Sequence, residues 1–464
     1  MNTASPLGRP ATSMDTIIEH SRFSWFHANL VFLAFLVMLF DGFDMQALGL
    51  AAPVIGAAWH LPRGALGPAF SSGLVGMMIG ATVLSPIGDR WGRKRAVILG
   101  AVAFGVCALL TAWSRSTAEL IILRLLTGAG IGLAIPNTVA LCAEYAPLRF
   151  RATSITTMFV GFTTGGVVAG LTASSVIPAY GWPALFVLGG TLPLVIAAIA
   201  WFALPESLQY LLTRHDGEPR VRAVLRKIVP PHLVEQSASF VATRKERTGL
   251  PVRHLFTEGR MLLTILLWTC YVANLFTLYF ILNWLPTVID NAGLSLQRAA
   301  IVTAWFSVGG IIGSLLIGRL IDRKITQPVG WFFGLGAVMI VLIGTASTSG
   351  SMVEAATFGA GIFVIGAQAG LNALAGLSYP KFMLATGVGW ALGIGRLGSI
   401  IGPVVGGQLV AWQLSVQQTF VCGATPMVIG GIACFGLLRL RRKTSAQALR
   451  LEEASPAFED GASR

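Results

Sequence analysis

Charged side chains are scarce in this sequence. Only 11% of its 464 residues are Asp, Glu, Lys or Arg, whereas 54% are hydrophobic. A soluble domain carries about a quarter charged residues, so this chain has too few to cover a surface exposed to water. The composition therefore excludes a soluble protein and predicts one embedded in a membrane.

The sequence also lacks the residue patterns of several common kinds of site. Its five cysteines all lie inside apolar runs without metal-ligand spacing, so we interpret them as small buried hydrophobic residues. The six histidines lie near helix ends or in loops, away from any proton path through the core. No Gly-x-x-x-x-Gly-Lys-Ser/Thr loop is present, which argues against ATP-driven activity. We expect no cofactor, no metal and no enzymatic activity.

Long apolar runs dominate the rest of the chain. Roughly 20 apolar residues cross a bilayer as a helix, and twelve such runs lie near 26–50, 66–87, 95–113, 118–142, 155–176, 183–204, 261–286, 298–320, 330–347, 352–378, 386–411 and 417–440. No cleavable signal peptide is evident. The sequence predicts an all-α membrane protein with 12 transmembrane helices. Its predicted parts are a tail (1–25), a six-helix half (26–204), a central loop (205–260), a second six-helix half (261–440) and a second tail (441–464).

The net charge of +13 is distributed unevenly among the gaps between runs. One set of gaps includes the central loop and is rich in basic residues: Arg90, Arg93, Lys94, Arg95, Arg149, Arg151, Arg319, Arg323, Lys324 and Lys381. The opposite gaps offer only Arg63, Arg115 and Arg298. Because Lys and Arg mark cytoplasmic loops, both termini and the central loop are predicted to be cytoplasmic. This pattern accounts for the positive charge without nucleic-acid binding.

The two halves repeat a short motif. Ser85-Pro-Ile-Gly-Asp89-Arg90-Trp-Gly-Arg93-Lys94 follows the second run, and Gly318-Arg-Leu-Ile-Asp322-Arg323-Lys324 follows the eighth. The sequence thereby resembles the major facilitator superfamily, as it does in Arg124-x-x-x-Gly128 and Pro205-Glu206-Ser207. The resemblance implies two parallel six-helix halves with a substrate site between them near the midplane.

A narrower set of motifs resembles the aromatic acid:proton symporters, which import benzoate-like and hydroxybenzoate-like anions into bacteria. These motifs are Asp41-Gly-Phe-Asp44, Arg124-Leu-Leu-Thr-Gly-Ala-Gly-Ile-Gly, Pro136-Asn137, Glu144-Tyr145, Asn283-Trp284-Leu-Pro286 and Gly393-Ile-Gly-Arg396. The chain departs from the group at Leu384, where an arginine is usual, and Lys381 lies one turn earlier. The departure leaves the exact substrate open.

The predicted spans leave four charged residues as candidates away from the span ends: Asp41, Asp44, Arg124 and Arg396. Each costs about 2.5–3.5 kcal/mol at a helix centre, so such residues are functional by default. Asp41 and Asp44 are three residues apart and share a helix face. Two neighbouring carboxylates in a low dielectric do not both ionise easily, which suits proton coupling. The alternative is that Asp44 is solvated and only caps the helix.

Each half supplies one of the two embedded arginines. The guanidinium of Arg124 matches a carboxylate in shape, so it binds the substrate anion or pairs with Asp41 or Asp44. A purely structural ion pair is the alternative. Arg396, in the opposite half, is the second candidate anchor for an acid. Its alternative is a side chain that extends to the cytoplasmic surface.

Polar and aromatic residues at helical spacing complete the candidate binding site: Asn274 and Trp284 in the seventh run, and Gln368, Asn372 and Tyr379 in the tenth. Amides would bond ring hydroxyls and aromatic rings would stack on the substrate. Ordinary packing is the alternative for each of these residues.

Charged residues at the predicted cytoplasmic helix ends are candidates for gating. They are Asp89, Arg93, Glu144, Arg149 and Arg151 in the first half, mirrored by Asp322 and Arg323 in the second. In the resembling family such clusters pair while the cytoplasmic side is closed and separate as it opens. An orientation signal alone explains the basic members but neither Asp89 nor Glu144.

These features predict a proton-coupled importer of an aromatic carboxylate that works by alternating access in a bacterial inner membrane. Its expected partners are the small aromatic acid, protons and the lipid bilayer, with no nucleic acid, and we expect a monomer. Three alternatives stay open: an efflux antiporter of aromatic compounds or drugs, an importer of another organic acid or a sugar, and a membrane sensor.

Overall fold

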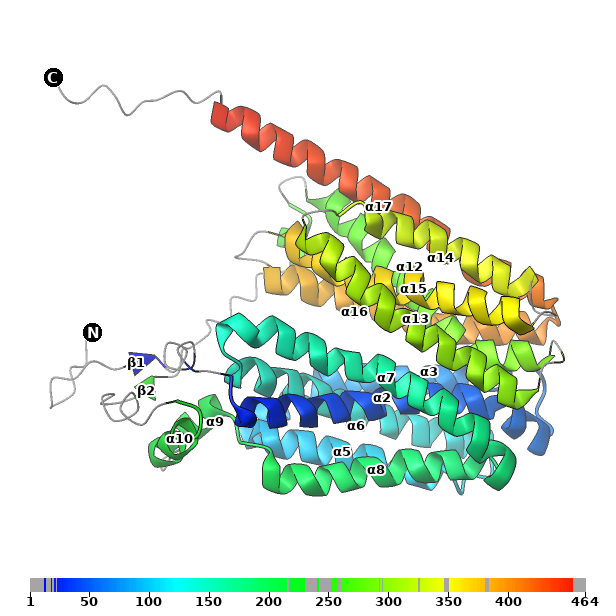
Figure 1. The fold of residues 1–464 in the computed structure, drawn as a ribbon, viewed down its shortest axis with the longest axis horizontal. Helices are drawn as coiled ribbons and strands as arrows, with labels where there is room; N and C mark the ends of the chain where they lie inside the picture. The colour runs from blue at the N-terminus through cyan, green and yellow to red at the C-terminus, as the bar shows by residue number, and fades with distance from the viewer. Residues whose placement is uncertain are drawn as a thin grey trace.

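The computed structural model describes residues 12–13, 18, 21, 23–214, 217–229, 240–241, 252–257, 260–291, 293, 295–323, 326–345, 350–379 and 384–453. Within this part of the chain, 12 helices are long and apolar enough to cross a membrane. This finding confirms the predicted all-α membrane fold. Figure 1 shows two groups of helices, one from each half of the chain.

The first group contains six membrane-spanning elements. They are α2 (Trp25–Ala58), α3 (Gly67–Ile79) continued by the π-helix η1 (Gly80–Leu84) and α4 (Ile87–Trp91), α5 (Arg93–Thr111), α6 (Thr117–Tyr145), α7 (Leu148–Tyr180) and α8 (Trp182–Ala203). The second group consists of α12 (Met261–Asn291), α13 (Leu296–Asp322), α14 (Pro328–Thr345), α15 (Gly350–Ser378), α16 (Leu384–Ala411) and α17 (Val416–Glu453).

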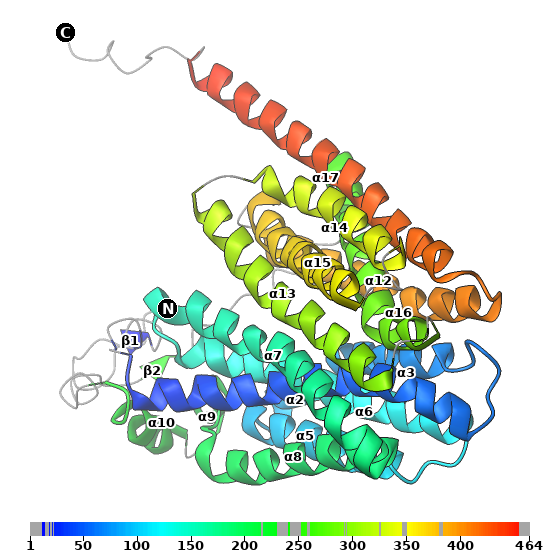
Figure 2. The same ribbon diagram turned by 45° about the vertical axis from the view of Figure 1, so that its right-hand side comes forward.

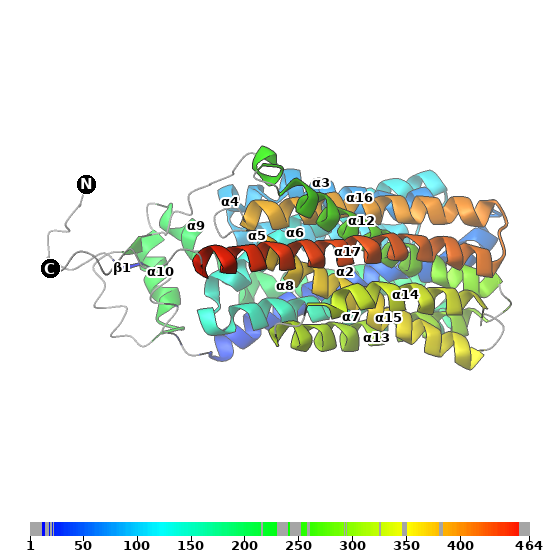
Figure 3. The same cartoon turned by 90° about the horizontal axis from the view of Figure 1, so that it is seen from above.

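Short elements lie at the end of the bundle where α2 begins and α17 finishes, which we call the terminal end; the opposite end is the far end. These elements are α9 (Leu208–Leu212), α10 (Gly217–Leu225) and η2 (Val252–Leu255). The two-residue strands β1 (Thr12–Ser13) and β2 (Phe240–Val241) pair in parallel. Figure 3 shows α10 beyond the membrane-spanning helices at this end.

The last helix is longer than the apolar run from which it was predicted. α17 has 38 residues, a length of about 57 Å, against a hydrocarbon core of about 30 Å. Its apolar span ends at Arg441, yet the helix continues to Glu453. The residues beyond Arg441 are rich in Ala, Leu, Gln, Arg and Glu, which are strong helix formers. The helix therefore enters the segment predicted as a tail.

Glycines bring pairs of helices into close contact inside each half. A methyl group added at any of the nine glycines named below, among others, would overlap the backbone of the partner helix. α2 packs in this way on α7, and α3 on α6; in the second half the matching pairs are α12 with α16 and α13 with α15. Small residues allow such close approach in membranes. The glycines are Gly42, Gly76, Gly128, Gly165, Gly309, Gly313, Gly361, Gly398 and Gly402.

The two halves meet through the far parts of their helices. The Ser71 hydroxyl donates to the carbonyl of Ile400 at 2.7 Å, and the rings of Phe70 and Trp284 lie 5.1 Å apart. A methyl group at Gly64 would overlap the carbonyl of Gly407. Figures 1 and 2 show the second-half helices sloping away from the first half toward the terminal end. The contacts named above thus join the halves at the far end, and the two groups of helices diverge toward the terminal end.

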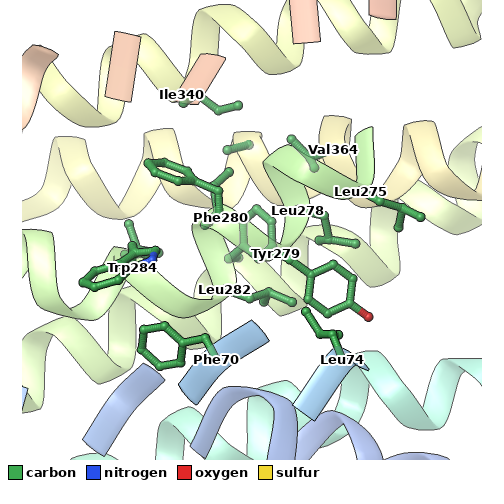
Figure 4. Packing of buried hydrophobic residues seen from close by; sticks show 14 of the residues in the cluster. Phe70, Leu74, Leu275, Leu278, Tyr279, Phe280, Leu282, Trp284, Ile340 and Val364 are labelled. Atoms are coloured by element: carbon green, nitrogen blue, oxygen red, sulfur yellow. The ribbon is translucent and has the colours of Figure 1, made fainter. Parts of the chain in front are cut away.

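The hydrophobic core follows the same division. One continuous cluster of buried residues includes the far part of the first half together with the second half. The terminal part of the first half has a separate cluster, which includes Leu30, Leu141, Tyr145, Leu208 and Leu225. The separation is a consequence of the divergence of the halves toward the terminal end. Figure 4 shows the shared cluster, with Phe70 of α3 beside Trp284 of α12.

The close contact between α13 and α15 predicts a stability difference between two glycine substitutions in one helix. A methyl group at Gly361 would overlap the carbonyl of Phe306, whereas one at Gly376 would meet nothing within 4 Å. We expect Gly361→Ala to lower stability by about 1–3 kcal/mol through overpacking. Gly376→Ala should leave stability unchanged or raise it. Thermal unfolding in detergent measures both, and equal midpoints for the two variants would contradict the close packing.

Candidate functional site

The first-half carboxylate Asp44 is joined to Arg124 by a two-point ion pair. Nη2 of Arg124 lies 2.9 Å from Oδ1 of Asp44, and Nη1 lies 3.1 Å from Oδ2. Both side chains are buried, with exposed fractions of 2% for Asp44 and 4% for Arg124. The guanidinium carbon also lies 5.5 Å from the ring centroid of Phe186, a cation–π contact. Arg124 is therefore already neutralised by the protein in this conformation.

A small cavity adjoins this pair at the boundary between the halves. Its volume is about 10 Å³, close to the space that one water molecule needs. Asp44, Arg124 and Phe70 line it from the first half, and Asn283 lines it from α12 of the second. Nε of Arg124 has no hydrogen-bond partner within the described residues. The ion pair thus lies at the interface and retains one unused donor.

Asp41 lies one helical turn from Asp44 toward the terminal end and is only 3% exposed. Its Oδ1 has no hydrogen-bond partner, and within the described residues it forms no ion pair. It does interact electrostatically with Arg396 of the opposite half and with Asp44. Of the two predicted carboxylates, Asp41 is consequently the one that can exchange a proton without first breaking an ion pair.

Arg396 of α16 lies beside Tyr279 of the neighbouring helix α12. Its Nη1 lies 3.5 Å from the hydroxyl oxygen of Tyr279 on α12, and its half-buried side chain has no carboxylate within 4 Å in the described part of the chain. Tyr279 interacts electrostatically with both Arg396 and Asp41. Figure 4 shows the Tyr279 hydroxyl directed toward the first-half helix that carries Leu74. Tyr279 therefore stands between the cation of one half and the free carboxylate of the other.

Four polar side chains form a connected chain between α12 and α15 on the terminal side of Tyr279. The Tyr271 hydroxyl donates to Oδ1 of Asn372 at 2.9 Å, and Nε2 of Gln368 donates to the same oxygen at 3.3 Å. Nδ2 of Asn274 donates to Oε1 of Gln368 at 2.9 Å. Oδ1 of buried Asn274 has no partner within the described residues, and Asn372 is exposed. The structure thus brings three of the predicted binding residues together.

The other two predicted binding residues lie elsewhere. The Trp284 indole donates to the carbonyl of Pro403 at 2.8 Å and packs on Phe70, within the far-end contact between the halves. The Tyr379 hydroxyl lies 3.3 Å from that of Thr264, close to the terminal end of α12. These positions put Trp284 and Tyr379 on opposite sides of Arg396 along the bundle.

The predicted gating residues of the first half form a network at the terminal end. Nη1 of Arg93 lies 2.7 Å from Oε2 of Glu144, and Nη2 lies 3.7 Å from Asp89. Glu144 also accepts hydrogen bonds from the Ser207 hydroxyl at 2.8 Å and the Gln209 backbone N–H at 2.7 Å. The network joins α5 and α6 to the segment that follows α8, entirely within the first half.

Within the described residues, Arg149, Arg151 and Arg323 take no part in this network. The Arg149 guanidinium carbon lies 4.5 Å from the ring centroid of Phe150. Nε of Arg151 is buried without a partner among the described residues, and Arg323 is exposed. The side chains of Asp322 and Leu384, and all of Lys381, lie outside the described residues. The described residues therefore do not include the side chains that would form a matching network in the second half.

Sequence reasoning missed three polar residues at the interface. Besides Tyr271 and Tyr279, it overlooked Gln46, whose Nε2 donates to the Ser307 hydroxyl across the two halves at 2.8 Å. The available signal was a single polar side chain inside an apolar run, which is rare in membrane helices. A search for buried charge alone does not find such residues.

Comparisons with known proteins agree with this architecture. The chain is 36% identical over 422 residues to the gallate transporter of Pseudomonas putida, with 90% of this chain and 94% of that protein covered. It is 34% identical over 435 residues to the 4-hydroxybenzoate transporter PcaK of Pseudomonas aeruginosa, with 93% and 97% covered.

Among solved structures, the xylose transporter XylE from E. coli in a partially occluded inward open conformation is similar in fold. Its TM-score is 0.67 at 18% identity, with 89% of this chain and 99% of that chain covered. The family model described as Major Facilitator Superfamily matches residues 34–403 and 267–460. With twelve spanning helices in two repeated halves, the chain belongs to the Major Facilitator Superfamily.

Proposed function

We propose that this protein is a proton-coupled importer of an aromatic carboxylate of the benzoate or hydroxybenzoate type in a bacterial inner membrane. The observation that carries the proposal is the arrangement of Arg396 and Asp41. Arg396 of the second half and Asp41 of the first half interact electrostatically across the halves, and within the described chain neither of them forms an ion pair. Relatives named as gallate, 4-hydroxybenzoate and benzoate transporters support the substrate class.

The orientation follows from the basic residues at the terminal end. Arg93, Lys94, Arg95, Arg214 and Arg220 lie there. Because basic residues favour the cytoplasmic side, the terminal end faces the cytoplasm and both chain termini are cytoplasmic. The side on which the halves diverge is then the cytoplasmic side, so the structure corresponds to an importer ready to release substrate or to return empty.

The substrate carboxylate binds the guanidinium of Arg396 in this proposal, because a charge-assisted pair is strong in a low dielectric. The ring then extends along α12 toward Asn274, about 7.5 Å from the level of Tyr279 at 1.5 Å per residue. This length suits a benzene ring carrying a hydroxyl group. The free Oδ1 of Asn274 accepts a hydrogen bond from that hydroxyl, and exposed Asn372 lies at the entrance.

Asp41 carries the coupled proton. The cytoplasm is electrically negative, and each elementary charge costs about 2.3 kcal/mol per 100 mV. A bare organic anion would be driven outward, whereas one accompanying proton removes this penalty. Protonation of Asp41 also removes the attraction between Asp41 and Arg396, which frees Arg396 for the substrate. The Asp44–Arg124 pair keeps the neighbouring charges balanced while the halves rock.

Removing the proton carrier should separate coupling from transport. We expect Asp41→Asn to abolish accumulation of 4-hydroxybenzoate against its gradient, while exchange of labelled for unlabelled substrate continues. Asp41→Glu keeps a carboxylate and should retain part of the coupling. The measurement is uptake by proteoliposomes with an imposed pH gradient. The matched control is Glu119→Gln, which removes an exposed carboxylate from the start of α6.

Wild-type accumulation by Asp41→Asn would remove Asp41 from the coupling mechanism. The same proteoliposomes also test the direction of transport. Symport accumulates substrate in the direction of proton flow. Movement of substrate against proton flow would instead identify an efflux antiporter.

The buried ion pair should reveal its role through a double substitution. Asp44→Asn or Arg124→Gln alone leaves one uncompensated charge in the membrane interior, which should destabilise the protein by about 3–5 kcal/mol. The double variant has no buried charge at this position and should recover most of that stability. We expect its uptake to stay below about a tenth of wild type, because the ion pair beside the interface between the halves is absent. Full uptake by the double variant would make the pair purely structural.

Charge recognition by Arg396 predicts a change in ligand preference. Losing a charged hydrogen bond costs about 1.5–3 kcal/mol, so Arg396→Gln should bind benzoate at least about tenfold more weakly. Neutral benzamide should bind both proteins with similar affinity. Competition against labelled 4-hydroxybenzoate measures this preference, with Arg319→Gln on the exposed surface of α13 as the control. An unchanged benzoate preference in Arg396→Gln would place the carboxylate elsewhere.

A further inference from the structure

A large cavity at the terminal end belongs to neither the candidate substrate site nor the gating network. Its volume is about 800 Å³, and it lies between the ends of α5 and α8 and the segment that carries α9 and α10. Both basic and apolar residues line it. The principal lining residues are Lys94, Arg95, Arg214, Arg220, Ile98 and Trp201.

The four cations of this cavity have no ion-pair partners. Within the described part of the chain, none of them has a carboxylate oxygen within 4 Å. Arg214 contacts only Tyr210, through its hydroxyl and through its ring at 5.0 Å. Arg95 and Arg220 are exposed. Four cations without a close ion pair, facing the single carboxylate of Glu206 in the lining, favour a ligand with negative charge.

One carboxylate, that of Glu206, also lines the cavity, but the fold already uses it. Oε1 of Glu206 accepts the backbone N–H of Lys94 at 3.1 Å and that of Ser207 at 2.9 Å. Lys94 is the second residue of α5, so Glu206 satisfies a free N–H at a helix start, where negative charge is favourable. The Glu206 carboxylate is therefore mainly engaged by backbone N–H groups, one of them at the start of α5, and it leaves most of the charge of the four cations unneutralised.

The apolar residues that line the cavity lie toward the membrane. Trp201 is 59% exposed at the end of α8, and the neighbouring Phe202 is 87% exposed. Trp residues are enriched where a membrane meets water. Ile98, one turn into α5, continues the apolar wall into the span. A soluble anion makes no favourable contact with apolar side chains, whereas the glycerol and first acyl carbons of a phospholipid pack against them.

We propose that this cavity binds the headgroup phosphate of an anionic phospholipid from the adjacent leaflet. The phosphate lies among Lys94, Arg95, Arg214 and Arg220, and the acyl chains leave past Trp201 into the bilayer. Basic pockets at the cytoplasmic ends of membrane helices bind phospholipid headgroups in this manner. The bound lipid holds the α9–α10 segment against α5.

The position of the lipid also links it to the gating network. Lys94 follows Arg93 in the chain, and Ser207, which bonds Glu144, follows Glu206. A lipid that holds α9 and α10 in place therefore stabilises the Arg93–Glu144 pair from outside. The site is independent of the transported substrate.

Native mass spectrometry of the purified full-length protein tests the proposal. The protein is mixed with phosphatidylglycerol, phosphatidylethanolamine or phosphatidylcholine in detergent. We expect one phosphatidylglycerol to remain bound preferentially. Arg214→Gln/Arg220→Gln should weaken its binding about thirtyfold, because each cation near a membrane surface contributes to lipid attraction. Arg95→Glu, on the opposite wall, is a second variant with the same expected direction.

The control removes two cations from the same end of the other half. Arg319→Gln/Arg439→Gln should bind phosphatidylglycerol as wild type does, since both side chains are exposed and away from the cavity. Equal binding of the three lipids, or unchanged binding in both cavity variants, would overturn the proposal. Full displacement of the lipid by equimolar glycerol phosphate would also overturn it, by identifying a site for soluble phosphates.

Discussion

A charge inside a membrane must be neutralised, and this constraint organises the centre of the protein. Two acids and two arginines lie at the middle of the bundle, where an isolated ion is expensive. Asp44 and Arg124 neutralise each other within the first half at 2.9 Å. Asp41 and Arg396 attract each other across the halves without forming an ion pair within the described residues. The first pair is self-contained, whereas the second can be altered by a proton or by an external carboxylate.

This difference between the two pairs explains how binding is coupled to movement of the halves in the proposed transport cycle. A ligand shifts a conformational equilibrium only as far as it binds the two conformations differently. Asp41 and Arg396 belong to different halves, so any ion between them is sensitive to how the halves are arranged. Asp44 and Arg124 both belong to the first half and move together. In the proposed cycle, the interface pair of Asp41 and Arg396 converts binding into movement, and the internal pair of Asp44 and Arg124 keeps the first half intact.

Most of the fold could be predicted from the sequence, because bilayer thickness fixes the length of an apolar run. The ends of the helices were harder to predict. α17 continues to Glu453 after its apolar span has ended, because the residues there are strong helix formers. Each embedded charge could be recognised in the sequence as a single charged residue inside an apolar run; these are Asp41, Asp44, Arg124 and Arg396. Their partners depend on which helices become neighbours, and spacing along one helix does not contain that information. The roles of Tyr279 and of the Gln46–Ser307 contact were invisible for the same reason.

The glycines of the far-end contact have a kinetic consequence. Where Gly64 meets Gly407 and Gly49 meets the Leu282 carbonyl, backbone lies against backbone, and the rings of Phe70 and Trp284 pack beside these contacts. Glycine has no side-chain rotamer entropy to lose or regain. Such a surface can separate and close again without repacking, so its barrier to opening is low. The lifetime of the far-end contact then depends on the few side chains that cross it, such as the Ser71 hydroxyl on the Ile400 carbonyl and the ring of Phe70 on that of Trp284.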